Sequence, residues 1–295
     1  MQRIGIAGLG LMGTAIAQRL LGAGFAVIGY DIDPEKRARF AQTGATSVPT
    51  LWVLAGQCDT LFLAVFDTDQ VEVVIEGECG VLAARRAAAS RLTLICTSTC
   101  DPERIGALAA RIESPQVGFL EMPVSGTSGQ VAKGEGVGLV AGAREVADGV
   151  STVLAAVCPR RHFLGAAGNG GKAKLAVNLV LGLNRGAVAE GLVFAAAMGL
   201  EPVAFLDVLR NSAAYSQVMD VKGTLMARRE FQQPVSRVDQ SLKDFSLMLD
   251  CARALGQELP FAQVYAELLR GCIAAGEAQW DNAAILAEIA RRRVG

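Results

Sequence analysis

The chain opens with Ile4-Gly5-Ile6-Ala7, a short apolar run that leads directly into Gly8-Leu9-Gly10-Leu11-Met12-Gly13 and then into an Ala/Leu-rich stretch. A second apolar run, Ala26 to Tyr30, closes on Asp31. This order predicts a strand, a glycine-rich turn, a helix and a second strand, which together bind a dinucleotide. The first glycine permits a tight turn, the second lets the backbone approach a pyrophosphate at the helix N-terminus, and the third lets the helix lie close to the strand. The residues expected to bind this cofactor are Gly8, Gly10, Leu11, Met12, Gly13 and Asp31.

Asp31 predicts which dinucleotide is bound. A carboxylate at the end of the second strand can accept hydrogen bonds from both ribose hydroxyls, and it would repel a 2′-phosphate. No Arg or Lys follows at the next position, because Lys36 and Arg37 come only later. NAD is therefore expected, and NADP is disfavoured. The alternative is that Asp31 merely caps the following helix, but Asp33-Pro34 makes the better cap because proline suits the first helical position.

Composition narrows the functional classes. At 295 residues the chain is expected to hold about two domains, and 52% hydrophobic residues allow a large core. The net charge of −1, without a basic run, gives no reason to expect nucleic acid or an anionic membrane as a partner. The longest apolar stretch, Ala173 to Leu200, is interrupted by Asn, Arg and Glu residues. It predicts a long buried helix and no membrane span.

The cysteines and the single histidine argue against metal chemistry. Seven cysteines without a C-x-x-C pair favour reduced thiols in a cytoplasm. Cys96 and Cys100 are four residues apart, but no histidine or acid cluster accompanies them. His162 is the only histidine, which excludes a multi-histidine metal site. We expect no metal, and we expect His162 in a strand or loop near a domain junction.

The patterns predict an α/β chain with two domains. Strands expected at 60–65, 92–96, 117–120 and 137–141 alternate with helices that include 102–112 and 145–157. Such alternation indicates a mostly parallel sheet with helices on both faces and ligands at the carboxyl ends of its strands. A Rossmann-type, doubly wound dinucleotide-binding domain is therefore expected over residues 1–164.

Strand signals vanish after about residue 165. A long helix is expected from about residue 171 to 198, followed by helices at 202–211, 240–255, 260–275 and 282–293. Gly199, Gly223, Gly256 and Gly276 are expected near helix C-termini. The basic Arg291-Arg292-Arg293 is expected to be a solvated last turn. We therefore expect an all-helical domain for substrate binding and oligomerisation over residues 165–295.

Four segments of the chain resemble the β-hydroxyacid dehydrogenase family, which includes 3-hydroxyisobutyrate dehydrogenase and tartronate semialdehyde reductase. They are Gly8–Gly13, Pro123-Val124-Ser125-Gly126, Gly168-x-Gly170-x-x-x-Lys174-x-x-x-Asn178 and Lys243-Asp244-Phe245. Their order and spacing agree over most of the chain. The resemblance implies an oxidoreductase that transfers a hydride between NAD(H) and a short 3-hydroxy acid or semialdehyde. It also implies a homodimer or homotetramer.

Lys174 is the expected catalytic residue. It lies one helical turn from Asn178, so both side chains project from one face. A lysine amine in a stretch poor in charge gives up its proton more readily and can exchange it near neutrality. The resemblance implies that Lys174 is the general base of alcohol oxidation and the general acid of aldehyde reduction. A helical lysine is otherwise most often solvated, which is how we interpret Lys172.

The substrate carboxylate has an expected binding loop. Ser125-Gly126-Thr127 combines hydroxyls with backbone N–H groups that suit a small carboxylate. The resemblance implies that this loop binds the acid group together with Asn178, and that Lys243 adds a positive charge near substrate and cofactor. Asp244 is expected to hold its local helix. Without the resemblance, the loop is an ordinary polar turn and Lys243 a surface charge.

Two further strand ends are expected to line the cofactor. Thr97 follows one strand, and Val65 and Phe66 end another. Several residues near the carboxylate loop depart from the family pattern: Cys96, Glu121, Met122, Thr127 and Gln130. The bulk and hydroxyl of Thr127 favour a smaller or more polar acid than hydroxyisobutyrate. An imine reductase and a catalytically silent dinucleotide-binding protein are the alternatives, although imine reductases typically use NADPH and carry Asp or Tyr at the position of Lys174.

Overall fold

The computed structural model describes residues 3–86 and 90–292. The chain forms two compact units, which divide between Lys174 and Leu175, inside helix α10 (Asn169–Ala197). The sequence places the division before this helix, at residue 164. The helix belongs in part to each unit, so the domain boundary at residue 164 stays a prediction.

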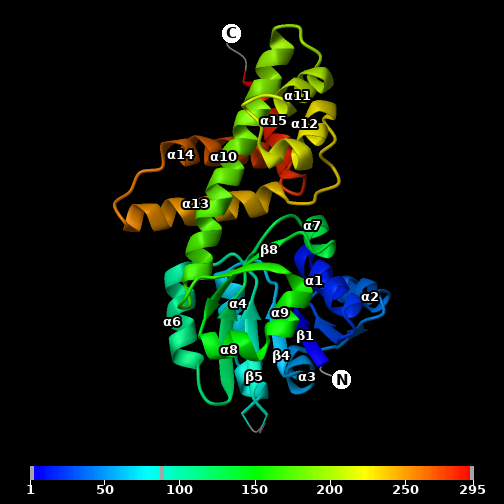
Figure 1. Ribbon diagram of the computed structural model, residues 1–295, viewed down its shortest axis with the longest axis vertical. Coiled ribbons are helices and arrows are strands. Elements are labelled where there is room, and N and C mark those ends of the chain that lie inside the picture. Colours follow the sequence, from blue (N-terminus) through cyan, green and yellow to red (C-terminus); the bar gives the residue numbers. More distant parts are fainter. Residues whose placement is uncertain (1–2, 87–89, 293–295) are drawn as a thin grey trace. The chain divides into compact units, whose positions relative to one another are not determined.

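The first unit contains a nine-stranded sheet among its described residues (Figure 1). The strand order is β3-β2-β1-β4-β5-β6-β8-β7, with β9 paired to β8. All pairings from β3 to β6 are parallel, whereas β8 runs antiparallel to β6 and β7. The bounds are β1 (Arg3–Ala7), β2 (Ala26–Tyr30), β3 (Thr46–Ser47), β4 (Thr60–Leu63), β5 (Leu92–Cys96), β6 (Val117–Glu121), β7 (Val124–Ser125), β8 (Val137–Gly142) and β9 (Arg160–Phe163). The prediction of a mostly parallel, Rossmann-type sheet is confirmed.

Helices cover both faces of this sheet. Side chains alternate along each strand, so Ile95 belongs to one buried cluster and Leu94 to the other. Helices α1, α8 and α9 pack on the first cluster, and α3, α4 and α6 on the second. The bounds are α1 (Leu11–Gly22), α2 (Pro34–Ala41), α3 (Leu51–Gly56), α4 (Thr68–Glu76), α5 (Val81–Ala84), α6 (Pro102–Ile112), α7 (Ser128–Ala132), α8 (Arg144–Gly149) and α9 (Ser151–Val157).

The carboxyl ends of five parallel strands lie in one row. Ala7 pairs with Tyr30 on one side and with Leu63 on the other. The same row continues through Cys96 and Glu121. The residues that follow these positions therefore meet at one edge of the sheet, where an open α/β sheet binds its ligands.

Some expected elements differ from the structure. The strand expected at 60–65 ends at Leu63, because the chain then turns toward α4. The helix expected at 145–157 is two helices, which part at Val150, where the backbone leaves the helical region. His162 lies in β9 and is exposed.

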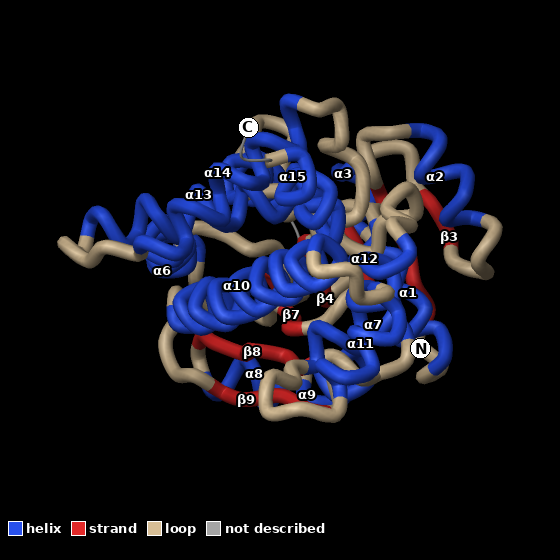
Figure 2. The backbone as a smooth tube through the Cα atoms, turned by 90° about the horizontal axis from the view of Figure 1, so that it is seen from above, coloured by secondary structure: helices blue, strands red, loops and turns tan. Residues whose placement is uncertain are grey.

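All named elements in the described residues of the second unit are helices, as the sequence predicts (Figure 2). Besides most of α10 it holds α11 (Pro202–Arg210), the π-helix η1 (Met219–Gly223), α12 (Thr224–Arg228), α13 (Val238–Ala254), α14 (Pro260–Ala274), the 3₁₀ turn η2 (Asn282–Ala284) and α15 (Ile285–Arg291). Its core contains a buried ion pair between Lys222 and Asp281, with N–O distances of 2.7 and 2.6 Å. The backbone N–H groups of Val235 and Ala283 also donate to Asp281, so this carboxylate joins three separate segments.

Glycines follow three of these helices. Gly199, Gly256 and Gly276 have positive φ and follow α10, α13 and α14, as expected. The expectation for Gly223 is wrong, because it has helical angles and continues into α12. A Cβ atom there would lie 2.6 Å from a methyl carbon of Leu206, so close packing explains this glycine.

The basic end of the chain also differs from expectation. The Arg291 guanidinium forms ion pairs with Glu277 at 2.6 Å and with Glu288 at 2.9 Å, and Arg292 pairs with Glu288 at 3.0 Å. These arginines are therefore partnered by carboxylates, not merely solvated. Arg293 lies outside the described residues.

Helix α10 is less buried than its composition predicts. It is long and apolar enough to cross a membrane by length and composition alone, a test that core helices of soluble proteins also pass. Only 28% of its most apolar 18-residue stretch is buried within the chain. The expectation of a buried helix is therefore wrong for a single chain. An exposed apolar stripe runs along the helix and consists of Ala176, Val180, Ala187, Phe194 and Met198.

Candidate functional site

The three glycines after β1 have three different environments. Gly8 has a φ of 97°, and a Cβ atom there would lie 2.4 Å from the carbonyl oxygen of Ala64. A Cβ at Gly13 would lie 1.9 Å from the carbonyl oxygen of Gly8, so Gly13 allows α1 to approach the strand end. No atom lies within 4 Å of a Cβ built at Gly10. A tight turn, an open backbone approach and a close helix contact are what a pyrophosphate-binding turn requires, so the residues present fit a dinucleotide.

Asp31 lies at the end of β2 and is buried, with 7% of its surface exposed. Its carboxylate accepts hydrogen bonds from the backbone N–H of Leu9 at 2.7 Å and of Asp33 at 3.0 Å. Asp31 therefore links the glycine-rich turn to the second strand. Asp33 caps α2 by accepting from Glu35 N, with Pro34 at the first helical position, so the cap is the residue that the sequence indicates.

Two cations near Asp31 were not anticipated. Lys36 Nζ lies 3.8 Å from a carboxylate oxygen of Asp31, and the Arg37 guanidinium donates to the Asp31 carbonyl at 2.6 Å. Both residues lie in the first turns of α2, which returns them to the end of β2. Lys36 and Arg37 therefore lie close to Asp31 in space, although they follow it by several residues in the sequence.

The ends of β4 and β5 are tied together by hydroxyl groups. The Thr97 hydroxyl donates to the Leu63 carbonyl at 2.9 Å, and the Ser98 hydroxyl donates to the Val65 carbonyl at 2.7 Å. The N–H of Phe66 donates to the side chain of Gln70. Val65, Phe66 and Thr97 thus lie at the predicted sheet edge, where these hydrogen bonds hold them.

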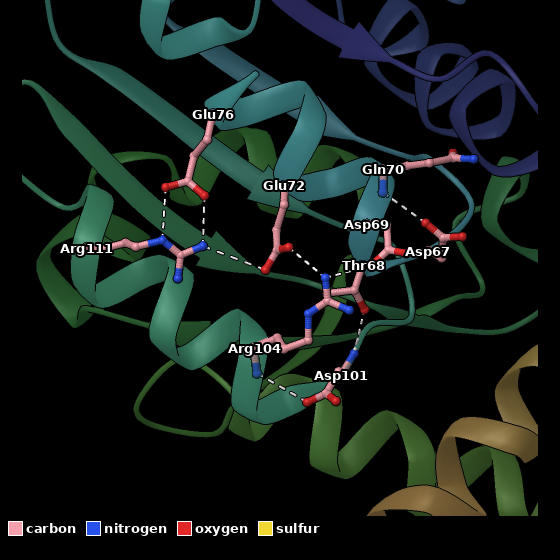
Figure 3. A network of polar contacts seen from close by, with 9 residues as sticks. All are labelled: Asp67, Thr68, Asp69, Gln70, Glu72, Glu76, Asp101, Arg104 and Arg111. Carbon is pink, nitrogen blue, oxygen red and sulfur yellow. Dashed lines mark hydrogen bonds and ion pairs between the residues drawn. The ribbon is translucent and has the colours of Figure 1, made fainter. Parts of the chain in front are cut away.

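A network of charges joins the helices that follow these two strands (Figure 3). The Arg104 guanidinium on α6 donates to Asp69 and Glu72 of α4, both at 2.6 Å. Arg111 on α6 forms a two-bonded pair with Glu76 at 2.9 and 2.7 Å. Exposed pairs contribute little individually, but a network with bidentate geometry contributes more. It holds α4 against α6, and nothing local in the sequence signals it.

The proposed carboxylate loop is built around a helix cap. The Thr127 hydroxyl accepts from Gln130 N at 3.2 Å, and the Gln130 side chain accepts from Thr127 N at 2.9 Å. This reciprocal capping box begins α7 and accounts for both departures from the family pattern. The pattern Thr-x-x-Gln is visible in the sequence and could have indicated it. Gly126 has a φ of 142°, which favours glycine at this position.

The two lysines at the start of α10 differ as expected. Lys174 is 9% exposed, and its ammonium donates to the Val124 carbonyl at 2.7 Å. Val124 directly precedes Ser125, so the amine lies at the predicted carboxylate loop. Lys172 has 58% of its side chain exposed and forms an ion pair with Glu103 at 3.5 Å. The prediction that Lys172 is the exposed one is confirmed.

Two other departures have structural explanations. Glu121 is 3% exposed, and its carboxylate accepts from the backbone N–H groups of Gly168 and Gly171. Burial raises the pKa of Glu121, and these hydrogen bonds oppose the increase. The hydrogen bond with Cys100 and burial raise the pKa of the Cys96 thiol, so Cys96 is a neutral residue. No local signal in the sequence identified the partners of Glu121.

In the second unit, three residues of the family motifs form one chain of contacts. The Asn178 side-chain amide donates to Asp244 at 3.0 Å, and Lys243 Nζ lies 2.9 Å from the other oxygen of Asp244. Asp244 is 8% exposed. It therefore orients Asn178 of α10 and Lys243 of α13, whereas the sequence predicts only a local role within its own helix.

Comparison with known proteins covers most of the chain. Residues 3–165 match the family model described as the NAD binding domain of 6-phosphogluconate dehydrogenase, and residues 168–289 match NAD-binding of NADP-dependent 3-hydroxyisobutyrate dehydrogenase. L-threonate dehydrogenase of Cupriavidus necator is 32% identical over 97% of this chain and 95% of its own length. The 2-hydroxy-3-oxopropionate reductase of Escherichia coli is 31% identical over 96% of each chain. The structure of 3-hydroxyisobutyrate dehydrogenase from Salmonella typhimurium superposes with a TM-score of 0.88 at 27% identity, covering 97% of this chain and 99% of that one.

The fold and the open glycine-rich turn define a class, the nicotinamide-dinucleotide-dependent oxidoreductases with a Rossmann-type unit followed by a helical unit. Within that class, the chain belongs to the β-hydroxyacid dehydrogenase family. Members of this family act on short hydroxy acids with NAD(P). The predicted fold class, family and general activity are therefore confirmed.

Proposed function

We propose that this protein is an NAD-preferring dehydrogenase of short 3-hydroxy acids in which Lys174 transfers the hydroxyl proton. The observation that carries the proposal is the position of the Lys174 ammonium. It is buried and bonded to the Val124 carbonyl, immediately before the Ser125-Gly126-Thr127 loop. A desolvated amine within reach of a substrate loop has the properties of a general acid–base group.

The first unit would hold the cofactor through the residues that follow its strands. Gly8 to Gly13 would bind the pyrophosphate, and Asp31 would bind the adenosine ribose. Val65, Phe66 and Thr97 would lie further along the same sheet edge. When bound, NAD supplies the acceptor for the hydride that leaves the substrate carbon.

Lys174 can transfer a proton and keep its hydrogen bond to the Val124 carbonyl. As a neutral amine it keeps two N–H groups and one lone pair, so it can still donate to the Val124 carbonyl while the lone pair accepts the hydroxyl proton. In the reverse direction the ammonium returns that proton to the aldehyde oxygen. Ser125 and Gly126 would hold the carboxylate of the substrate. The family resemblance adds Asn178 as a substrate-binding residue and Lys243 as a source of positive charge.

The substrate class follows from the loop and from the relatives. The capping box of Thr127 and Gln130 makes the loop bulkier and more polar than a run of glycines. The relatives are named for L-threonate and for 2-hydroxy-3-oxopropionate, both short acids that carry additional oxygen atoms. We therefore propose a short, hydroxylated acid in preference to hydroxyisobutyrate.

An absorbance assay of nicotinamide reduction tests this function. The substrates would be L-threonate, 3-hydroxyisobutyrate and, for reduction, 2-hydroxy-3-oxopropionate, each with NAD and NADP. We expect turnover with at least one acid and a higher kcat/KM with NAD. Turnover of cyclic imines with none of the acids would favour an imine reductase, and NAD binding without any turnover would favour a catalytically silent protein.

We also propose that the protein is a soluble cytoplasmic homo-oligomer. The apolar stripe of α10, defined above, leaves Val180 and Phe194 59% and 64% exposed in a single chain. Water contact with so continuous an apolar helix face is unfavourable, so a second copy of this chain would cover it. Light scattering at micromolar concentration should return a dimer or tetramer. A monomer of 30.8 kDa would contradict this proposal.

A further inference from the structure

The first turn of α10 is held by a carboxylate from another part of the chain. The first N–H groups of a helix have no partner within the helix, and a side chain just before it usually caps them. Here Gly168 precedes the helix and offers no side chain. Glu121, at the end of β6, instead accepts from the N–H groups of Gly168 and Gly171.

The glycines of this turn fit the Glu121 side chain. A Cβ atom on Gly170 would lie 3.0 Å from Cβ of Glu121 and 2.9 Å from the Leu139 carbonyl oxygen. A Cβ atom on Gly171 would lie 3.2 Å from a carboxylate oxygen of Glu121. The glycines thus let the helix begin directly on this carboxylate, and the position at which a helix could bind an external anion is already filled.

The segment 121–124, which begins with Glu121, also binds Lys174. Its ammonium donates to the Val124 carbonyl, three residues beyond Glu121, while Glu121 binds the helix three residues before Lys174. The segment 121–124 and the first turn of α10 are therefore joined at two points. Removal of the Glu121 contact would release the first turn of α10 from the end of β6, and the bond from Lys174 to Val124 runs through a flexible side chain.

We infer that Glu121 is a positioning residue for Lys174, which anchors the start of α10 so that the lysine amine is held at the substrate loop. This inference rests on the proposed function of Lys174, but the anchoring itself is independent of it. Glu121 accepts from two backbone N–H groups at the start of α10, so it acts on Lys174 through the helix. A misplacement of about 1 Å can reduce turnover about 100-fold without contact with the substrate.

Glu121→Gln is the main test, because it keeps the size of the side chain and leaves one acceptor oxygen for two N–H groups. We expect kcat to fall at least tenfold while the KM and Kd for NAD stay within twofold. Amide hydrogen exchange over residues 168–174 should accelerate, with the remainder of the first unit unchanged. Glu121→Asp keeps both acceptor oxygens, and its kcat should lie closer to the wild-type value.

Gly171→Ala tests the same contact from the helix side, since it leaves the charge in place and pushes a methyl group against the carboxylate. It should reproduce the loss in kcat. Gly149→Ala is the matched control, because its Cβ meets no atom within 4 Å in the same unit. It should leave kcat unchanged.

Three outcomes would overturn the inference: unchanged exchange over 168–174 in Glu121→Gln, accelerated exchange with unchanged kcat, or a parallel loss of NAD affinity and Tm. Full activity of Lys174→Ala would instead refute the lysine role in the proposed function. In that case the exchange measurement would still decide whether Glu121 anchors the helix.

Discussion

Two glycine-rich turns in the first unit begin with a glycine of the same conformation and have opposite uses. Gly8 and Gly168 have φ values of 97° and 96°, and each opens a Gly-x-Gly run that leads into a helix. At α1 the Asp31 carboxylate accepts from Leu9 N, but the space beside Gly10 is open and no side chain caps the helix. At α10 the corresponding space is occupied by the carboxylate of Glu121.

The difference shows that a glycine-rich turn before a helix is open to an external anion only when no side chain of the chain caps the first N–H groups of that helix. Both turns present backbone N–H groups to a negative charge. The first is available to a pyrophosphate. The second uses an internal carboxylate to fix a helix that carries Lys174, so one turn would bind the cofactor and the other would position the chemistry.

The largest expected effect separates these two uses. Lys174→Ala should reduce kcat by about 10² to 10⁴, the usual contribution of a general acid–base group. NAD affinity, measured by fluorescence titration, should not change, because the open turn is at α1. Lys172→Ala is the control and should be nearly silent, since that side chain is exposed. Inactivity of Lys172→Ala combined with activity of Lys174→Ala would refute the assignment.

Within the open turn, Gly13 and Gly10 should respond in different ways. Gly13→Ala places a Cβ atom 1.9 Å from the Gly8 carbonyl oxygen and should lower the free energy of unfolding by about 3 kcal/mol. Gly10→Ala meets no atom and should leave stability within about 0.5 kcal/mol. It should instead weaken NAD binding by about tenfold, or about 1.4 kcal/mol. Urea unfolding and NAD titration measure the two effects, and wild-type affinity in Gly10→Ala would show that the pyrophosphate binds elsewhere.

The preference between NAD and NADP tests whether a 2′-phosphate can bind next to the open turn, where Asp31 lies. Asp31→Ser removes the carboxylate and leaves Lys36 without its ion-pair partner at 3.8 Å. The ratio of kcat/KM for NAD to that for NADP should fall at least tenfold, or about 1.4 kcal/mol. If the unaltered protein already prefers NADP by tenfold, Asp31 does not exclude the phosphate and the NAD assignment is wrong.

The smallest effect distinguishes Asp31 from its neighbour. Asp33 accepts from Glu35 N at 2.8 Å and caps α2. Asp33→Ala should cost about 1 kcal/mol of stability, as the loss of an N-cap usually does. The preference between NAD and NADP should stay the same. A change in preference in this variant would mean that the two aspartates share the ribose.

The sequence predicted the parts of the fold that depend on local rules. Strands β2 and β5 and helix α6 begin and end where their apolar patterns and the Asp101-Pro102 cap indicate. The α8–α9 break at Val150 and the π-helix around Lys222 were missed, because neither has a distinct local signal. A π-helix depends on how its segment packs, and here Lys222 reaches a buried carboxylate 59 residues away.

The candidate site likewise contains residues that local sequence rules could assign and contacts that only the tertiary structure decided. Gly8, Gly10 and Gly13 could be assigned from the sequence, because backbone angles and side-chain size alone suit them to their positions. Lys174 could be distinguished from Lys172 because a helix sends residues two apart to different faces. Tertiary structure alone decided that Glu121 caps α10, that Asp244 joins Asn178 to Lys243, and that Lys36 returns to Asp31. Each of these contacts joins groups from different elements, and a charge finds its partner through the folded backbone, which no local pattern specifies.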